Sequence, residues 1–389
     1  MYTSWAKNTS GSTHTINGGL VNGLGGASTN TTNSFGNGLL PNFLSVSGST
    51  RQNDLDVAFT ISIQPGSANN AALRQVGDNT TGVSSTANTG GMNNRQSFIT
   101  FGDKSWGSVK IGKDLGIFAS DAILSDITLL GVGAGAAGSA GNTSLGRIGA
   151  GYIYADWKPQ IAYTTPNFNG AQATVGISQA FASQANGSGA AWDNFSQPNA
   201  NVAYEGKASY SFAGNGVDGK IWVSGIAQHV GVAKYGSSSE TLDPMAYAGD
   251  IGAKISASGF DLVGYYYSGS GIGTTGQFLR GYGYNGDGKF EARDSNGGYI
   301  QAAYTLPTKT KVALSWGGSY LDRVSGEGSG WSGDSAQIVK SNEMWDAMVI
   351  QPLTKHLNLV AEYANQKSEN HAGEKNEVNV GSLGAILFF

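Results

Sequence analysis

Apolar and small polar side chains alternate at every second position in several long segments of this chain. Between residues 311 and 320 the even positions carry Val, Leu, Trp, Gly and Tyr, and the odd positions carry Lys, Ala, Ser, Gly and Ser. The same alternation runs through 57–64, 202–212, 299–306 and 357–364. A period of two places successive side chains on opposite faces of a β-strand, and no segment shows a convincing helical period. The pattern predicts an all-β chain arranged as an antiparallel meander.

The connections between these segments alternate in length. Long connections rich in Gly, Ser and Asn alternate with tight turns, so that seven tight turns and eight long loops would separate sixteen strands. An even number of strands, with short turns at one rim and long extracellular loops at the other, is typical of an outer-membrane barrel. We therefore predict one transmembrane antiparallel β-barrel domain over residues 1–389. The tight turns fall near 53–54, 104–107, 166–170, 214–219, 256–259, 307–310 and 352–356, and the long loops near 8–41, 65–92, 114–147, 183–199, 232–243, 270–295, 323–340 and 369–375.

The composition supports this interpretation. Charged residues make up 13% of the chain, against about 25% in a typical soluble domain. A soluble β-sandwich would need more charge on its outer face, and a β-helix would show a short internal repeat, which this sequence lacks. A lightly charged polar face suits a water-filled lumen, while the apolar face suits lipid, with Trp106, Trp222 and Tyr304 as candidates for the aromatic girdles.

Charge and cysteine content exclude several classes of function. The formal net charge of −4 does not suit a nucleic-acid partner, and the absence of cysteine excludes disulfides and thiolate metal sites. The N-terminal Met-Tyr-Thr-Ser-Trp has no basic or apolar export signal, so we expect the mature form of an exported protein.

Three stretches of the sequence resemble Gram-negative porins. Residues 94–103 followed by 106–113 resemble the hairpin that precedes the family's third loop, and residues 161–170 resemble the strand and turn that follow it. The chain ends in Phe389, which resembles the terminal aromatic that porins offer to the outer-membrane assembly machinery.

The resemblance implies a fold, a location and an activity. Porins of this family are outer-membrane homotrimers of 16-stranded barrels, surrounded by lipid and lipopolysaccharide. Their third loop, here about 114–147, folds into the lumen. The implied function is passive diffusion of small hydrophilic solutes and ions through a water-filled channel, without a cofactor and without catalysis.

The resemblance and the strand alternation together indicate pore-lining charges. Family constriction loops set carboxylates opposite arginines on the wall; Asp121 and Asp126 match the former, and Arg95 and Arg147 the latter. The tip of the loop, 131–138, contains only Gly, Ala and Val, so we expect a wider and less charge-selective constriction. Glu205 and Lys207 face inward by alternation, although they could instead pair across neighbouring strands and fix the register. Further inward-facing charges by the same assignment are Asp250, Lys254, Asp346 and Glu362.

One loop follows the spacing of a calcium-binding loop. Counting from Gly283, oxygen-bearing side chains occupy positions 3, 5, 9 and 12, and glycine occupies the bend at position 6. Position 1 is Gly and position 12 is the short Asp, so the pattern predicts at most a weak calcium site, and an ordinary Asn/Gly/Asp turn explains it better. The ligand positions are Asn285, Asp287, Glu291 and Asp294.

Two other functions fit the same barrel. A substrate-specific channel with a saturable site would need inward aromatics, and the register could place either Tyr265 and Tyr267 or Tyr266 inward. A surface adhesin or receptor would use the long loops and conduct nothing. An enzyme is not indicated, because the four histidines are dispersed and no Gly-x-Ser-x-Gly motif sits at a strand-to-helix turn.

Overall fold

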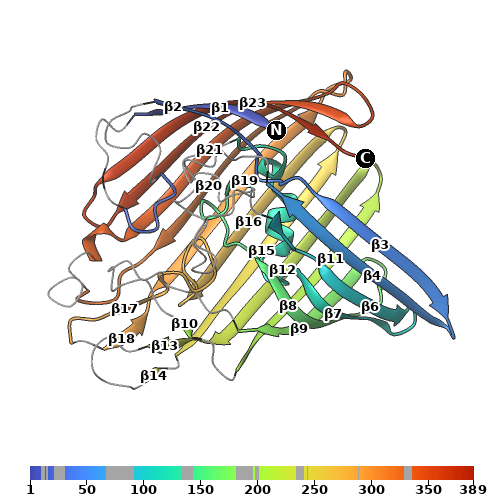
Figure 1. Cartoon of the computed structure of the whole chain (residues 1–389), viewed down its shortest axis with the longest axis horizontal. Helices are drawn as coiled ribbons and strands as arrows, with labels where there is room; N and C mark the ends of the chain where they lie inside the picture. The colour runs from blue at the N-terminus through green and yellow to red at the C-terminus, as the bar shows by residue number, and fades with distance from the viewer. Residues whose placement is uncertain are drawn as a thin grey trace.

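The computed structural model consists of a single large antiparallel sheet that curves around a short helix (Figure 1). It describes residues 1–9, 14, 16–21, 31–66, 92–133, 143–180, 196–197, 201–233, 241–242, 244–287, 289–327 and 335–389. The strands of the large sheet are β1 (Tyr2–Asn8), β2 (Thr31–Gly36), β3 (Leu44–Gln52), β4 (Leu55–Pro65), β5 (Met92–Asn93), β6 (Ser97–Asp103), β7 (Gly107–Leu115), β8 (Trp157–Thr164), β9 (Ala171–Gln179), β11 (Val202–Gly214), β12 (Val217–His229), β15 (Met245–Ala257), β16 (Phe260–Ser270), β19 (Asp294–Thr305), β20 (Lys311–Leu321), β21 (Val339–Pro352), β22 (Leu357–Asn370) and β23 (Lys375–Leu387).

The remaining elements lie in the connections. One small sheet combines β10 (Ser196–Gln197), β13 (Gly231–Ala233) and β14 (Thr241–Leu242), and another pairs β17 (Tyr282–Tyr284) with β18 (Phe290–Ala292). The helices are α1 (Ser120–Ser125), η2 (Ile127–Leu130) and η3 (Ser335–Gln337). Within the described residues, no helix is long and apolar enough to cross a membrane.

The predicted all-β meander is confirmed, because successive strands pair in antiparallel order along most of the chain. The count of sixteen is not confirmed, since the large sheet has 18 strands. One additional strand is β5, which continues β6 along the same edge of β4 after a shift of one residue. The other is β2, which lies within the predicted loop 8–41 and is separated from β3 by residues 37–43. In the described residues, β2 pairs only with β1, and β3 only with β4.

Residues 37–41 interrupt the wall because they bond to the interior instead. The Leu39 amide donates to the Gly131 carbonyl oxygen at 3.0 Å, and the Gly38 carbonyl accepts from the Ser144 amide at 3.0 Å. Leu39 is 4% exposed, and Pro41, which lacks an N–H, cannot donate to a ladder. This segment therefore leaves the sheet and packs on a loop inside the barrel.

The tight turns adopt the backbone geometry that their residues favour. Asn53 and Asp54 both have positive φ (51° and 61°), as do Asn215 and Gly216 (55° and 77°). Two successive residues of positive φ match the right-handed twist of the flanking strands. All seven predicted turns occur, whereas the predicted long connection at 369–375 contracts to four residues, 371–374, between β22 and β23.

The barrel is apolar outside and polar inside. Large apolar side chains on the outer face are exposed, among them Ile251 (58%), Leu314 (55%) and Ile300 (54%), while inward Ser319 and Asn342 are fully buried. This distribution inverts that of a soluble domain and suits a wall with lipid on one side and a hydrated interior on the other. Trp222 is an exception to the predicted girdle, because it points inward and is 2% exposed.

The exposed apolar face leads to a test of membrane insertion. Leu314→Arg should lower the free energy of unfolding by about 2–4 kcal/mol, the cost of an arginine facing lipid near mid-depth. Ser49→Arg, on the polar face of β3, should change it much less. Urea-induced unfolding of the protein folded in lipid vesicles measures both; equal losses would contradict the assignment of faces.

Candidate functional site

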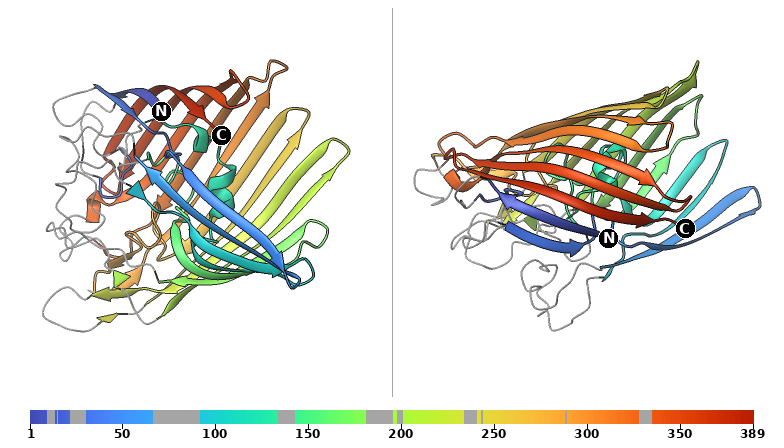
Figure 2. Two further views of the ribbon diagram at one scale, coloured as in Figure 1. Left: turned by 45° about the vertical axis from the view of Figure 1, so that its right-hand side comes forward. Right: turned by 90° about the horizontal axis from the view of Figure 1, so that it is seen from above.

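The longest described excursion into the barrel begins where β7 ends at Leu115. We call residues 116–156 the inward loop, of which 116–133 and 143–156 are described. The loop was predicted at 114–147, so it begins two residues later and ends nine residues later than predicted. It carries α1, which lies within the curve of the sheet (Figures 1 and 2). Ser120–Ile123 are buried, but the Leu124 side chain is 61% exposed. The helix thus packs one side on the wall and presents Leu124 to the lumen.

Glu205 on β11 holds the start of the inward loop. Its Oε2 atom accepts hydrogen bonds from the Ile117 and Phe118 amides, both at 2.9 Å. Its Oε1 atom accepts from the Ser178 hydroxyl at 2.9 Å and forms an ion pair with Lys158. Glu205 is 6% exposed, and a buried carboxylate is tolerated when donors surround it in this way.

Asp121 ties α1 to two lysines of the wall. Its carboxylate contacts the Lys207 ammonium at 3.1 Å and also forms an ion pair with Lys220. Burial acts to raise the pKa of Asp121, but the two ammonium groups outweigh it, so that the pKa lies below its usual value. Because the pKa is lowered in the folded state, the ion pairs of Asp121 stabilise the folded protein at pH values above the unfolded-state pKa of about 3.9. This stabilisation is lost as the pH falls through the lower pKa of the folded state.

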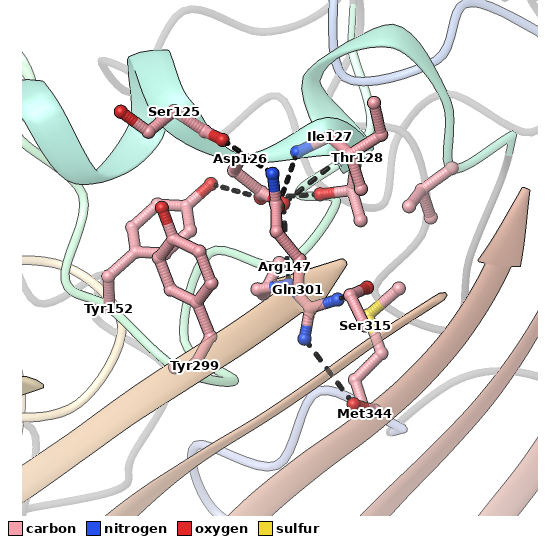
Figure 3. A network of polar contacts seen from close by, with 12 residues as sticks. Ser125, Asp126, Ile127, Thr128, Arg147, Tyr152, Tyr299, Gln301, Ser315 and Met344 are labelled. Atoms are coloured by element: carbon pink, nitrogen blue, oxygen red, sulfur yellow. Dashed lines mark hydrogen bonds and ion pairs between the residues drawn. The ribbon is translucent and has the colours of Figure 1, made fainter. Parts of the chain in front are cut away.

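Polar side chains of β19 satisfy the exposed backbone groups of α1 and η2. The Tyr299 hydroxyl donates to the Ala122 carbonyl at 2.7 Å. Gln301 donates to the Ser125 carbonyl at 2.9 Å and accepts from the Ile127 amide at 2.8 Å. Helix ends leave such groups without partners within the helix, and the wall supplies them here (Figure 3).

Arg147 and Asp126 join the two arms of the inward loop. Arg147 Nε lies 3.4 Å from Asp126 Oδ1, and both side chains are wholly buried. Asp126 also accepts from the Tyr152 hydroxyl at 3.0 Å and the Thr128 amide at 3.0 Å. The guanidinium reaches the wall through the Ser315 hydroxyl and, at 3.4 Å, the Met344 carbonyl (Figure 3).

Glu362 on β22 holds the far end of the first arm. Its carboxylate accepts from the Val132 amide at 2.6 Å and the Gly133 amide at 3.2 Å. A Cβ at Gly131 would lie 2.2 Å from Met348 Cε and 2.4 Å from Glu362 Oε1, so a larger residue there would displace these two side chains. Asp346, 1% exposed, lies beside Glu362.

The structure brings most of the predicted pore-lining residues together, yet few of them meet the lumen. Glu205, Asp346 and Glu362 lie beneath the inward loop, and Arg147 is a buried residue of the loop itself. Asp250 is also covered: it accepts from the Ser224 hydroxyl at 2.7 Å and the Tyr265 hydroxyl at 3.0 Å. The Ala119 amide in turn donates to Ser224 at 3.2 Å.

The other predicted residues lie nearer to water or at the ends of strands. Lys254 is exposed on the inward face. Arg95 lies between β5 and β6, with its guanidinium carbon 5.7 Å from the centre of the Trp157 ring. Phe389 is fully exposed. Most of the predicted Gly/Ala loop tip at 131–138 lies outside the described residues, which end at 133 on this side, so the width of the constriction stays a prediction.

Sequence reasoning missed several residues of the site. Lys158 and Lys220 face inward and pair with loop or wall carboxylates. Strand alternation could have found both. The anchoring roles of Tyr299 and Gln301 had no local signal, because their partners lie more than 170 positions away.

The predicted calcium loop forms an ordinary turn in the part that is described. The Asn285 side-chain oxygen accepts from the Asp287 and Lys289 amides at 3.0 and 2.8 Å, and its amide group donates to Glu291 at 2.7 Å. Asp294 begins β19, and Gly288 is outside the described residues. Among the described residues, no three His, Asp or Glu side chains are grouped as metal ligands. Weak calcium binding stays an untested prediction.

Fold and site together define a transmembrane β-barrel with a loop packed inside it. The family model for Gram-negative porins matches residues 4–371, and the chain belongs to that family. It is therefore a channel protein of the Gram-negative outer membrane. Comparison with curated protein sequences gives no match.

Solved structures share this fold at low sequence identity. The outer-membrane channel DcaP of Acinetobacter baumannii has a TM-score of 0.65 and 15% identity, with 100% of this chain and 95% of that chain covered. The anion-selective porin from Comamonas acidovorans has a TM-score of 0.55 and 13% identity, with 99% of each chain covered. OmpT of Vibrio cholerae, solved in a trimer form, has a TM-score of 0.53 and 10% identity, with 99% and 96% covered.

The anchoring by Glu205 is testable. Glu205→Ala should lower the free energy of unfolding by about 3–5 kcal/mol, because it leaves Lys158 and two amides buried without their acceptor. Glu369→Ala, which removes a carboxylate paired with the exposed Lys340 at 3.2 Å, should cost at most about 1 kcal/mol. Thermal unfolding in detergent, with limited proteolysis of the inward loop, measures both. A Glu205→Ala protein as stable and as protease-resistant as the parent would refute the anchor.

Proposed function

We propose that the channel works by passive diffusion of small hydrophilic solutes past the inward loop, driven only by their concentration gradients. The observation that carries this proposal is the position of α1. Tyr299 and Gln301 of the wall bind its backbone, and Glu205 binds the segment just before it, while Leu124 remains exposed. A constriction fixed on both arms reduces the cross-section of the lumen without closing it. The size limit of the channel is then set by the side chains that the loop presents to the lumen, and its charge preference is set by the side chains of the wall.

A saturable site for sugars or aromatic solutes finds less support. Tyr265 and Tyr267 do face inward, but they are 6% and 0% exposed, and Tyr266 is on the outer face at 52%. The Tyr265 hydroxyl donates a hydrogen bond to Asp250 beneath α1. Stacking on a solute requires an accessible ring face, which these two rings do not offer.

The proposed assembly is a homotrimer embedded in lipid and lipopolysaccharide. The family and the trimer form of OmpT support self-association, and the exposed apolar outer face supports contact with lipid. The exposed Phe389 is available to assembly machinery. No catalytic role is proposed.

Single-channel recording tests the channel and its constriction together. In a planar bilayer, the purified protein should insert with conductance steps in groups of three. Leu124→Trp should lower the conductance of each step and Leu124→Ala should raise it, because residue 124 borders the aqueous path. Leu353→Trp, a matched change at an exposed leucine in the turn after β21, should leave it unchanged. A folded protein that inserts without conducting would contradict the proposed function, and equal effects at 124 and 353 would contradict the role of α1.

A further inference from the structure

Three glycines lie side by side on the outer face of the barrel, across the neighbouring strands β11, β12 and β15 (Figure 1). Gly206 on β11 is opposite Gly225 on β12, and Gly225 is in turn opposite Gly249 on β15. All three face outward, because the residues two positions away on the same strands are exposed large side chains, namely Tyr204, Val223 and Tyr247. We call these three residues the glycine row.

The fold itself gives no steric reason for glycine at these positions. A glycine inside a strand weakens it, and it commonly marks a bulge, a left-handed backbone or the close approach of another group. The ladders pass through the row without a shift in register, and none of the three glycines has a φ in the left-handed region. A Cβ added to any of them would come no closer than 3.4 Å to an atom outside its chain neighbours. The space over the row is therefore open.

A second pair of facing glycines shows the contrast. Gly298 on β19 and Gly318 on β20 also lie opposite each other. A Cβ there would fall 2.4 Å from the Tyr265 carbonyl oxygen and 2.8 Å from the Tyr320 hydroxyl, so the chain already occupies the space beside them. The glycine row instead forms the floor of a trough that no described part of the chain fills.

Bulky apolar side chains border this trough. Toward the long loops, Tyr204 and Tyr247 lie on either side of Ala227. Toward the tight turns, Val223 and Ile251 lie opposite each other. At its β11 end the trough continues into a groove of about 770 Å³ over β8 and β9, whose lining includes Ile161, Tyr163, Val175 and Ile177. The trough is thus narrow and apolar, and it faces hydrocarbon.

The length and depth of the trough match one lipid chain. From Gly206 to Ser268 on β16, the next position of the same row, three strand spacings of about 4.8 Å give about 14 Å. One leaflet of hydrocarbon is about 15 Å thick, half of a core of about 30 Å. The three glycines lie four residues from the strand ends that adjoin long loops, which is roughly 9 Å below those ends at a tilt near 45°. Because long loops are extracellular, the trough lies in the outer leaflet.

Polar side chains mark one end of the trough. Ser268 lies opposite Asn296 on β19, and each is two residues from the long-loop end of its strand. This end therefore lies nearer the strand ends than the glycines do. It offers a hydroxyl and an amide at the level where a lipid chain joins its headgroup.

We propose that the glycine row holds one saturated acyl chain of lipopolysaccharide, with the ester or amide group of that chain at Ser268 and Asn296. A saturated chain is straight and slender, so it can lie in a straight, narrow trough and gain dispersion contacts along its whole length. Lipopolysaccharide supplies the chains of the leaflet on the long-loop side of an outer membrane. A second copy of the protein would meet the trough with a convex wall, which cannot follow a floor set between bulky side chains. The site does not depend on the proposed channel function.

Photo-cross-linking in outer membranes tests this site. Tyr247→p-benzoylphenylalanine places the probe beside the trough, and Tyr363→p-benzoylphenylalanine places it at an exposed tyrosine of β22 as the matched control. Mass spectrometry of the irradiated protein identifies each adduct. Position 247 should give a lipopolysaccharide adduct in several-fold higher yield than position 363. Adding Gly225→Leu should lower the yield at 247 about fivefold, the scale of losing roughly ten carbon–carbon contacts. Ala347→Leu, which adds a leucine to the exposed face of β21, should leave it unchanged.

The outcomes separate this site from ordinary contact with lipid and from the channel function. Gly225→Leu should fold and conduct as the parent does, because leucine suits both a strand and hydrocarbon better than glycine. Equal yields at 247 and 363 that Gly225→Leu does not change would overturn the site. A phospholipid adduct at 247 would overturn the assignment to lipopolysaccharide, and an adduct with a second copy of the chain would show a protein interface instead. A protein that gives the expected adducts but does not conduct would contradict the channel function and leave this site standing.

Discussion

The inward loop depends on side chains of the barrel wall that satisfy its backbone. A loop buried inside a protein carries polar groups that must find partners. Here Glu205 and Glu362 accept loop amides, while Tyr299 donates to a loop carbonyl and Gln301 both donates and accepts. These contacts come from β11, β19 and β22, so the position of the constriction follows from the arrangement of these strands and not from the loop sequence alone.

The same requirement explains why so many inward charges are absent from the aqueous path. Carboxylates beneath the loop serve as acceptors for backbone amides or as partners of Arg147 and Lys158. The charges left partly in water include Lys207, Lys220 and Lys254 of β11, β12 and β15. Lys207 and Lys220 belong to both groups, because they also pair with Asp121 of α1. A substitution at either lysine would therefore affect both the position of the loop and the charge of the lumen.

The sequence predicted the architecture well, because a period of two and tight turns with Asn, Asp or Gly are local signals. It predicted which residues face inward, as Glu205, Lys207 and Asp250 show. It could not predict which of these the loop would cover, since that depends on contacts such as Tyr299 with Ala122, 177 positions apart. The six residues of α1 were missed because so short a helix has no visible period. Strand β2 was also missed, since it falls within the loop predicted at 8–41.

The central claim is that the inward loop is fixed to the wall and sets the conductance. The chain has no cysteine, so a cysteine pair at Ala119 and Ser224, whose amide and hydroxyl lie 3.2 Å apart, provides a clean tether. The measurement is single-channel conductance of this double variant before and after reduction of the disulfide. We predict the same conductance in both states, because the tether holds the loop where it already lies. A clear rise on reduction would show that the loop leaves the wall, and would contradict the account.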